Sequence, residues 1–98
     1  MKHETILELE KFAARLAELD QVSIRDGVST HFIEIRDSGE REVTVGANRE
    51  GLLHLALVCL TLAAKGTEGS HQHFDEAGLV DKCDRALIIA LHAAEWDS

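Results

Sequence analysis

Apolar residues recur every three to four positions near the start of the chain, over residues 3–20. The apolar face is formed by Ile6, Leu9, Ala13, Leu16 and Ala17, with Phe12 beside it. Glutamate, lysine and arginine residues follow the opposite face at the same spacing. This spacing predicts an amphipathic helix over residues 3–20, whose apolar face packs against another element.

A second helical pattern covers residues 49–65 and is much more apolar. Asn48 is a good N-cap for it, and Lys65 followed by Gly66 is a typical helix end. Its polar positions form one narrow line: His54, Thr61 and Lys65. Such a helix needs apolar cover on two sides. The simplest arrangement lays it on a sheet with the first helix against its flank, and a homodimer interface through helix 49–65 is the alternative.

Alternation with a period of two replaces the helical spacing over residues 29–46. The inward positions are Ile33, Ile35, Val43 and Val45. The outward positions are Glu34, Arg36, Glu42 and Thr44. Between the two runs, residues 37–40 read Asp-Ser-Gly-Glu, which is a turn signal. The pattern therefore predicts a hairpin over residues 29–46.

Two further strands are predicted at residues 70–75 and 85–92, separated by a loop over residues 76–84. The last strand is centred on Leu87-Ile88-Ile89 and is apolar on both faces, which is typical of a central strand. The order helix, strand, strand, helix, strand, strand (αββαββ) indicates the α+β class. We expect a four-stranded, mostly antiparallel sheet with both helices on one face.

The length of 98 residues fits a single domain, residues 1–98, with one core. We expect that core to hold four residues in one cluster: Leu55, Leu62, Phe74 and Ile89. Leu79 and Val80 are expected to be tucked under the loop between the last two strands, and Trp96 to dock back or fray with the tail.

The formal net charge is −8, from 18 acidic and 10 basic residues. A negative field repels phosphate backbones and anionic lipid surfaces, so neither nucleic acid nor membrane is an expected partner. The field favours a basic protein partner instead. The N-terminus has no apolar signal region, and the longest apolar run, residues 55–60, is too short to span a bilayer. We therefore expect a soluble, cytoplasmic protein.

Residues with metal-ligand chemistry gather in the third predicted strand, where His71, His73 and Asp75 share one face. Imidazole and carboxylate groups can bind zinc, nickel or copper. A strong site needs further ligands, and the sequence has no second closely spaced pair. We expect no bound metal and no cofactor. A metal- or small-ligand-binding domain using His71 and His73 is kept as an alternative.

Catalytic patterns are missing from the sequence. It contains no nucleophile elbow, phosphate loop or dinucleotide-binding fingerprint. Ser70 and His71 are neighbours on a predicted strand and point to opposite faces, so they do not form a catalytic pair. Cys83 has acidic neighbours that do not favour a reactive thiolate. We predict that the protein is not an enzyme.

The open face of the predicted sheet is the largest candidate binding surface. It carries a mixture of charges and imidazoles, as protein-binding surfaces often do. The candidate partner-binding residues are Glu34, Arg36, Glu42, His71, His73 and Asp75.

Two segments carry a family resemblance. Residues 45–53 read Val-Gly-Ala-Asn-Arg-Glu-Gly-Leu-Leu, and residues 69–76 read Gly-Ser-His-Gln-His-Phe-Asp-Glu. With Gly78-Leu79 and Leu87-Ile88-Ile89 downstream, the chain resembles the immunity protein 32 family of bacterial polymorphic toxin systems over about residues 43–91. It departs at residues 81–84, where the family pattern suggests a small Gly-Ser turn and this chain has Asp-Lys-Cys-Asp.

The resemblance implies an α+β protein, encoded beside a toxin gene, that binds and neutralises that toxin without catalysis. It assigns no functional residue. The other hypotheses are the metal- or small-ligand-binding domain and a structural or regulatory dimer built on helix 49–65.

Overall fold

The computed structural model describes residues 1–21, 24–25, 28–29, 31–75 and 80–92. Its elements in chain order are α1 (His3–Gln21), β1 (Ile24–Arg25), β2 (Val28–Ser29), β3 (Ile33–Gly39), β4 (Glu42–Ala47), α2 (Arg49–Lys65), β5 (His71–Phe74), β6 (Lys82–Cys83) and β7 (Leu87–Ala90). The α+β class is confirmed. The expectations for Asp26-Gly27, Leu79 and Trp96 fall outside the described residues.

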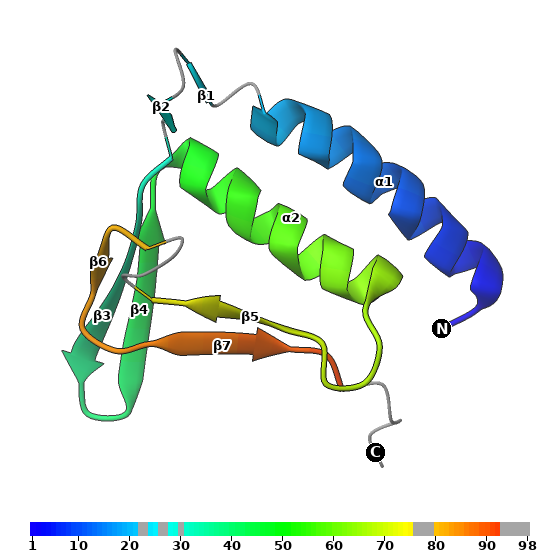
Figure 1. Cartoon of the computed structure of the whole chain (residues 1–98). Coiled ribbons are helices and arrows are strands. Elements are labelled where there is room, and N and C mark those ends of the chain that lie inside the picture. Colours follow the sequence, from blue (N-terminus) through cyan, green and yellow to red (C-terminus); the bar gives the residue numbers. More distant parts are fainter. Residues whose placement is uncertain (22–23, 26–27, 30, 76–79, 93–98) are drawn as a thin grey trace.

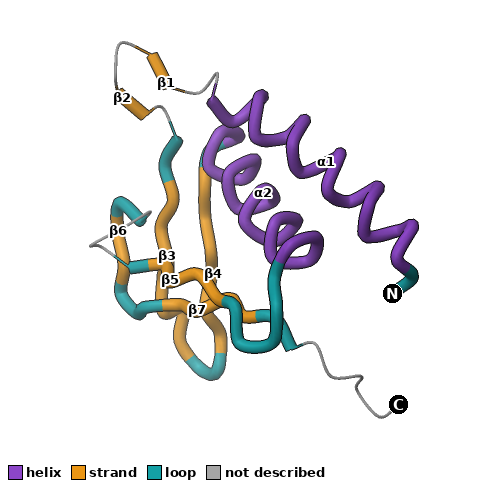
Figure 2. The backbone as a smooth tube through the Cα atoms, turned by 45° about the vertical axis from the view of Figure 1, so that its right-hand side comes forward, coloured by secondary structure: helices purple, strands orange, loops and turns teal. Residues whose placement is uncertain are grey.

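The helix α2 lies between α1 on one side and the strands on the other, and both views show this order (Figures 1 and 2). The predicted apolar face of α1 packs against α2, with Ala13 only 4% exposed. The predicted bounds of both helices are confirmed to within one residue. No helix among the described residues is long and apolar enough to cross a bilayer.

The strands form separate small sheets, and the prediction of one four-stranded sheet is wrong. One sheet has the order β4-β3-β6, a second pairs β5 with β7, and β1 pairs with β2. The reason is β6, which lies in the predicted loop and pairs in parallel with β3. Because β4 and β6 occupy both edges of β3, no edge of this central strand is left for β5 or β7.

The predicted strand lengths also need correction. The first hairpin strand begins at Ile33 rather than residue 29, and the turn closes at Arg41, where the backbone has φ 62°. Gly39 before it has φ +104°, a conformation that glycine adopts without strain. The strands predicted at 70–75 and 85–92 shorten to His71–Phe74 and Leu87–Ala90.

Aspartate side chains extend the short contact of β6 with β3. Asp81 accepts a hydrogen bond from the Ile33 N–H at 2.9 Å, and its own N–H donates to the Ile33 carbonyl at 2.8 Å. Asp84 accepts from the Asp37 N–H at 3.2 Å and donates its N–H to the Ile35 carbonyl at 2.9 Å. These carboxylates satisfy N–H groups at the β3 edge that a two-residue strand cannot reach. The segment from Asp81 to Asp84 thus holds β6 against β3 through both backbone and side-chain hydrogen bonds.

Replacing Asp81 with alanine should lower the free energy of unfolding by about 1–3 kcal/mol, because the partly buried Ile33 N–H loses its acceptor. Asp84→Ala is the matched control, since its longer bond is exposed and its loss should cost less. Urea unfolding of both variants measures the difference. Equal losses would mean that the Asp81 carboxylate does not hold β3.

The core lies between α2 and the two larger sheets. Its buried members are Ile33, Ile35, Phe74 and Val80. Partly buried residues pack against them: Ala47, Leu55, Val58, Cys83, Leu87 and Ile89. The predicted burial of Phe74 and Val80 is confirmed, and Leu55 and Ile89 join the same cluster only partly buried. Leu62 is partly buried and does not belong to the cluster.

The inward face of β4 and the outward face of β7 are less covered than their sequences predict. The register sets Val45 opposite Ile35 and Val43 opposite Asp37, so both valines point to the core side of the sheet. They are nevertheless 42% (Val43) and 37% (Val45) exposed. Ile88 on β7 is 55% exposed, which corrects the expectation of a central strand apolar on both faces. A two-stranded sheet has only one face against this core.

Candidate partner-binding surface

The outer face of β3 and β4 carries the predicted mixture of charges. Glu34 and Arg36 point away from the buried isoleucines of β3, and their side chains form an ion pair at 3.6 Å. Glu34 lies across Gly46 on β4 and is only 24% exposed at its side chain, whereas Arg36 is 64% exposed. By strand alternation, the exposed Glu42 lies on the same face near the hairpin turn.

A shallow hollow lies at the turn end of this face, lined by Arg36, Asp37, Ser38, Thr44 and Asp84. The Ser38 and Thr44 hydroxyls form a hydrogen bond across the hairpin. Asp37 forms an ion pair with Arg85 at 2.7 Å. The charges here largely neutralise one another, which suits a contact surface better than a reactive centre.

The predicted histidines lie on a different sheet. His71 and His73 share the outer face of β5 with their ring centroids 4.9 Å apart, edge to face. The His71 Nδ1 contacts the Gly69 carbonyl at 2.8 Å, so this nitrogen carries the proton because a carbonyl can only accept. The neighbours across the strand pair are Ala90 and Ile88, which cannot ligate a metal. Within the described part of the chain, no group of three His, Cys, Asp or Glu side chains is placed to hold a metal ion.

Five of the six candidate residues therefore form two patches rather than one surface, and Asp75 belongs to neither. The structure brings Glu34 and Arg36 together, with Glu42 on the same sheet face. It brings His71 and His73 together on the β5–β7 sheet, and Asp75 follows at the end of β5. We call these the charged patch (Glu34, Arg36, Glu42) and the histidine patch (His71, His73).

One polar cluster escaped the sequence analysis. The His54 Nδ1 on α2 contacts Asp20 Oδ2 on α1 at 2.8 Å, and their side chains are only 17% (His54) and 14% (Asp20) exposed. The His31 ring stacks on His54 with centroids 4.8 Å apart. His54 is the sequence feature that could have indicated this cluster, because it is a polar residue inside a very apolar helix. Its partners, distant in sequence, could not be identified from a local pattern. These contacts link α1, α2 and the segment that leads into β3.

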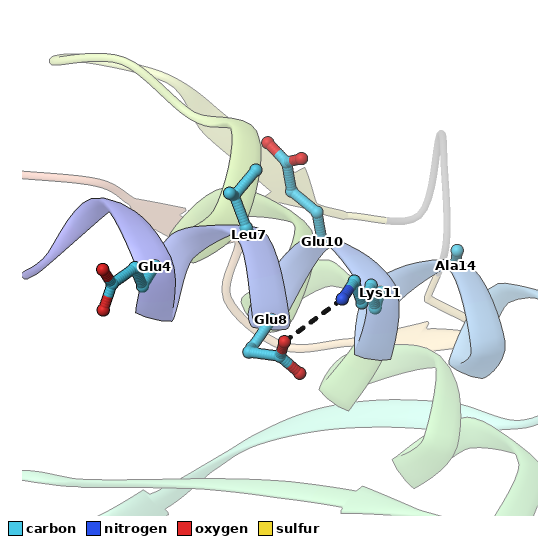
Figure 3. Close-up of a pocket in the computed structure, with 6 residues that line it drawn as sticks. All are labelled: Glu4, Leu7, Glu8, Glu10, Lys11 and Ala14. Atoms are coloured by element: carbon cyan, nitrogen blue, oxygen red, sulfur yellow. Dashed lines mark hydrogen bonds and ion pairs between the residues drawn. The ribbon is translucent and has the colours of Figure 1, made fainter.

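An open hollow also runs along α1 and is lined by Glu4, Leu7, Glu8, Glu10, Lys11 and Ala14. Figure 3 shows Glu8 reaching Lys11 across one turn, an ion pair of 3.2 Å, while Leu7 and Glu10 project from another side of the helix. The side chains of this ion pair are strongly exposed, 61% for Glu8 and 75% for Lys11. We therefore assign no binding role to this hollow.

The segment from β4 to β7 can be compared with known families. Residues 42–91 match the profile of a family described as Immunity protein 32. The chain belongs to the immunity protein 32 family. The matched segment of this immunity protein contains β4, α2, β5, β6 and β7, while α1 and β3 precede it. No curated protein and no solved structure gave a significant match to the chain.

The Asn-Arg-Glu-Gly segment of this immunity protein holds the junction between sheet and helix. The Asn48 Oδ1 accepts hydrogen bonds from the Gly51 N–H at 2.8 Å and the Phe32 N–H at 2.9 Å, and the Asn48 N–H donates to the Phe32 carbonyl. The predicted N-cap is confirmed. A Cβ at Gly51 would lie 2.3 Å from the Phe32 carbonyl oxygen, so the helix can approach β3 this closely only with glycine.

The helix α2 ends at Lys65 as predicted, but without the left-handed glycine that ends many helices. Gly66 has an extended backbone with φ −70°, and its N–H donates to the Leu62 carbonyl. A Cβ there would meet that carbonyl oxygen at 2.4 Å and Leu91 Cδ2 at 2.9 Å. Glycine is thus required for space rather than for a positive φ.

Proposed function

We propose that this immunity protein 32 chain binds a cognate bacterial toxin in the cytoplasm and neutralises it by occupying the toxin's surface. The match of residues 42–91 to the family carries the proposal, since neutralising a toxin is the role that the family name describes. The mode of action is binding and not catalysis. In its support, the polar groups on both outer sheet faces are exposed or paired with one another, as in contact surfaces.

The charged patch is our choice for the toxin contact. It lies on the side of the three-stranded sheet that faces away from the core, so binding there leaves the packing of the domain unchanged. A specific interface buries roughly 600–1,000 Å² on each partner, so the toxin contact would extend beyond the three residues of the charged patch. Arg36 and Glu42 are exposed enough to meet a partner directly. The net charge of −8 would draw a basic toxin toward the protein.

The direct test expresses the product of the toxin gene adjacent to the gene for this chain, with and without the chain, and counts surviving cells. Survival restored by the chain, together with a complex that co-purifies, is the expected outcome. A toxic neighbour that kills equally well in the presence of the chain would refute the proposed function.

Charge reversal tests the chosen surface. Glu42→Lys should lower the rate of association with a basic toxin severalfold, most strongly at low salt, with little change in thermal stability. Glu4→Lys on α1 is the matched control, because it changes the net charge equally but lies outside the charged patch. Surface plasmon resonance at two salt concentrations measures both rates. Equal association rates for the two variants would mean that only the net charge of the protein affects binding. The toxin contact would then lie outside the charged patch.

A further inference from the structure

The strand β4 forms one edge of the three-stranded sheet, and no described strand pairs with its outer side. It has six residues, whereas β5 and β7 have four each and β6 has two. It is therefore the longest open edge among the described strands. Proteins often protect such an edge with lysine or proline. β4 contains neither, and Glu42 is its only charged residue.

The hydrogen bonds of the sheet show which backbone groups of β4 face this open edge. The Ile35 carbonyl accepts from the Asp84 N–H at 2.9 Å, and the Asp37 N–H donates to the Asp84 carboxylate at 3.2 Å. Both β3 residues thus direct these groups away from β4. In an antiparallel pair, directly opposite residues either bond to each other or both point away. Val45 lies opposite Ile35 and Val43 opposite Asp37, so the N–H and C=O groups of both valines point to the open edge.

The side chains along this edge are accessible on both faces of the sheet. Val43 and Val45 lie on the core side and are 42% and 37% exposed. Thr44 and Glu42 are exposed on the outer face, where Glu42 belongs to the charged patch. The edge thus combines a row of backbone donors and acceptors with apolar groups on one face and polar groups on the other. An extended strand is the occupant that fits, because its own N–H and C=O groups repeat at the same spacing.

We propose that the toxin adds an extended segment to this sheet, hydrogen-bonded to the open edge of β4. This inference rests on the proposed function and specifies how the toxin is held. Side chains of the added segment alternate between the two faces of the sheet. Those on the core side meet Val43 and Val45 and are apolar, and those on the outer face lie beside Thr44 and Glu42 and are basic or polar. From there the toxin continues onto the charged patch, which adds area to the contact.

A second copy of this chain fits the edge less well than the toxin does. Edge pairing extends a sheet in its own plane, so two copies joined through β4 would leave both charged patches uncovered. The contact would be limited to the six residues of β4 from each copy, whereas a standard interface takes about 20–30 residues from each partner. Each copy also carries a net charge of −8, which repels another copy and attracts a basic partner.

Replacing Val45 with proline tests the added strand. Proline removes the N–H that points to the open edge, and an edge strand tolerates it because no hydrogen bond to β3 is lost. Val45→Ala is the matched control, since it removes the side chain but keeps the N–H. Isothermal titration calorimetry with the toxin encoded beside this chain should show about tenfold weaker binding for Val45→Pro than for Val45→Ala. Circular dichroism checks that both variants are folded.

Amide hydrogen exchange of the wild-type chain tests the same contact without a substitution. In the free chain, the Val43 and Val45 amides should exchange faster than those of Thr44 and Gly46, which face β3. In the toxin complex, exchange of the two valine amides should slow by roughly tenfold or more. Valine amides that exchange at the same rate in the free chain and in the complex would overturn the proposal.

These experiments distinguish the added strand from the proposed function. A wild-type chain that forms no complex with the toxin refutes both. A toxin that binds Val45→Pro as tightly as Val45→Ala, and also binds the wild type, leaves the proposed function standing and refutes the added strand. Sedimentation gives the remaining comparison: a free chain that is a dimer, and becomes a monomer on Val45→Pro, places a second copy at this edge and refutes the toxin as its occupant.

Discussion

Replacing Phe74 with alanine should lower the free energy of unfolding by about 3–5 kcal/mol. Phe74 is 0% exposed and belongs to the cluster of buried residues that joins β3 and β5. Its removal leaves a cavity between the two sheets and α2, with no neighbouring element free to fill it. Because domains of this length have a total stability of about 5–15 kcal/mol, the variant should be close to unfolded at 37 °C.

The matched control is Phe12→Ala on α1. The chemical change is the same, but Phe12 is 62% exposed, so the loss should stay below about 1 kcal/mol. Urea denaturation of the two variants, fitted with a common slope, measures both values. Similar losses for the two phenylalanines would contradict the placement of the core between the sheets.

Replacing Gly51 with alanine should destabilise the protein by about 1–3 kcal/mol. The expected sign of the stability change is unusual, because replacing glycine with alanine inside a helix ordinarily stabilises the helix by about 1 kcal/mol. At Gly51 the new methyl group would lie 2.3 Å from the Phe32 carbonyl oxygen and 2.9 Å from Ala47 Cβ. The helix would have to move away from β3 and weaken the Asn48 hydrogen bonds that link the two.

The control for Gly51 is the opposite substitution at an open helical position. Ala14→Gly on α1 should cost about 0.5–1 kcal/mol through ordinary helix propensity, since Ala14 is exposed. Thermal unfolding of both variants gives the comparison. A Gly51→Ala protein that is more stable than wild type would show that the junction between β3 and α2 is looser than described.

The helices could be predicted from the sequence because their signals are local. The period of 3.6 residues, the Asn48 cap and the Lys65-Gly66 end all lie within a few residues of the boundaries they define. The inward faces of the strands followed equally well from alternation, since Ile33 and Ile35 are both fully buried. The degree of burial did not follow, because it depends on how far α2 extends over each sheet.

The sheet arrangement could not be predicted because it depends on β6. Two residues, Lys82 and Cys83, carry too short a pattern to indicate a strand. Their pairing with β3 is stabilised by the side chains of Asp81 and Asp84, which bind backbone groups nearly fifty residues away in sequence. This long-range bonding places β6 at the edge of β3, whereas β5 pairs with β7 in a sheet of its own.

The candidate site was predicted in its parts but not in its arrangement. Alternation correctly grouped Glu34 with Arg36 and His71 with His73. It did not show that the two pairs lie on separate sheets, because strand order is not encoded in the pattern of one strand. The cluster of Asp20, His31 and His54 was missed for the same reason, since its members come from three separate segments.

The segment that matches the family contains two of the structural features described above. The matched segment includes the Asn48–Gly51 junction and the β5 strand that carries the histidine patch. The first of these holds the sheet against α2 and has no exposed chemistry of its own. The Asn48–Gly51 junction within the matched segment thus contributes to the packing of α2 against the start of the sheet.

We propose that the protein neutralises its toxin by binding and not by catalysis. The most direct measurement titrates a fixed amount of the purified cognate toxin with this chain and records the remaining toxin activity. We predict a linear fall to zero at one chain per toxin, unchanged by longer incubation, with full activity recovered when the complex is dissociated. Complete inactivation by a small fraction of an equivalent, progressing with time, would contradict the account, as would full toxin activity in an excess of the chain.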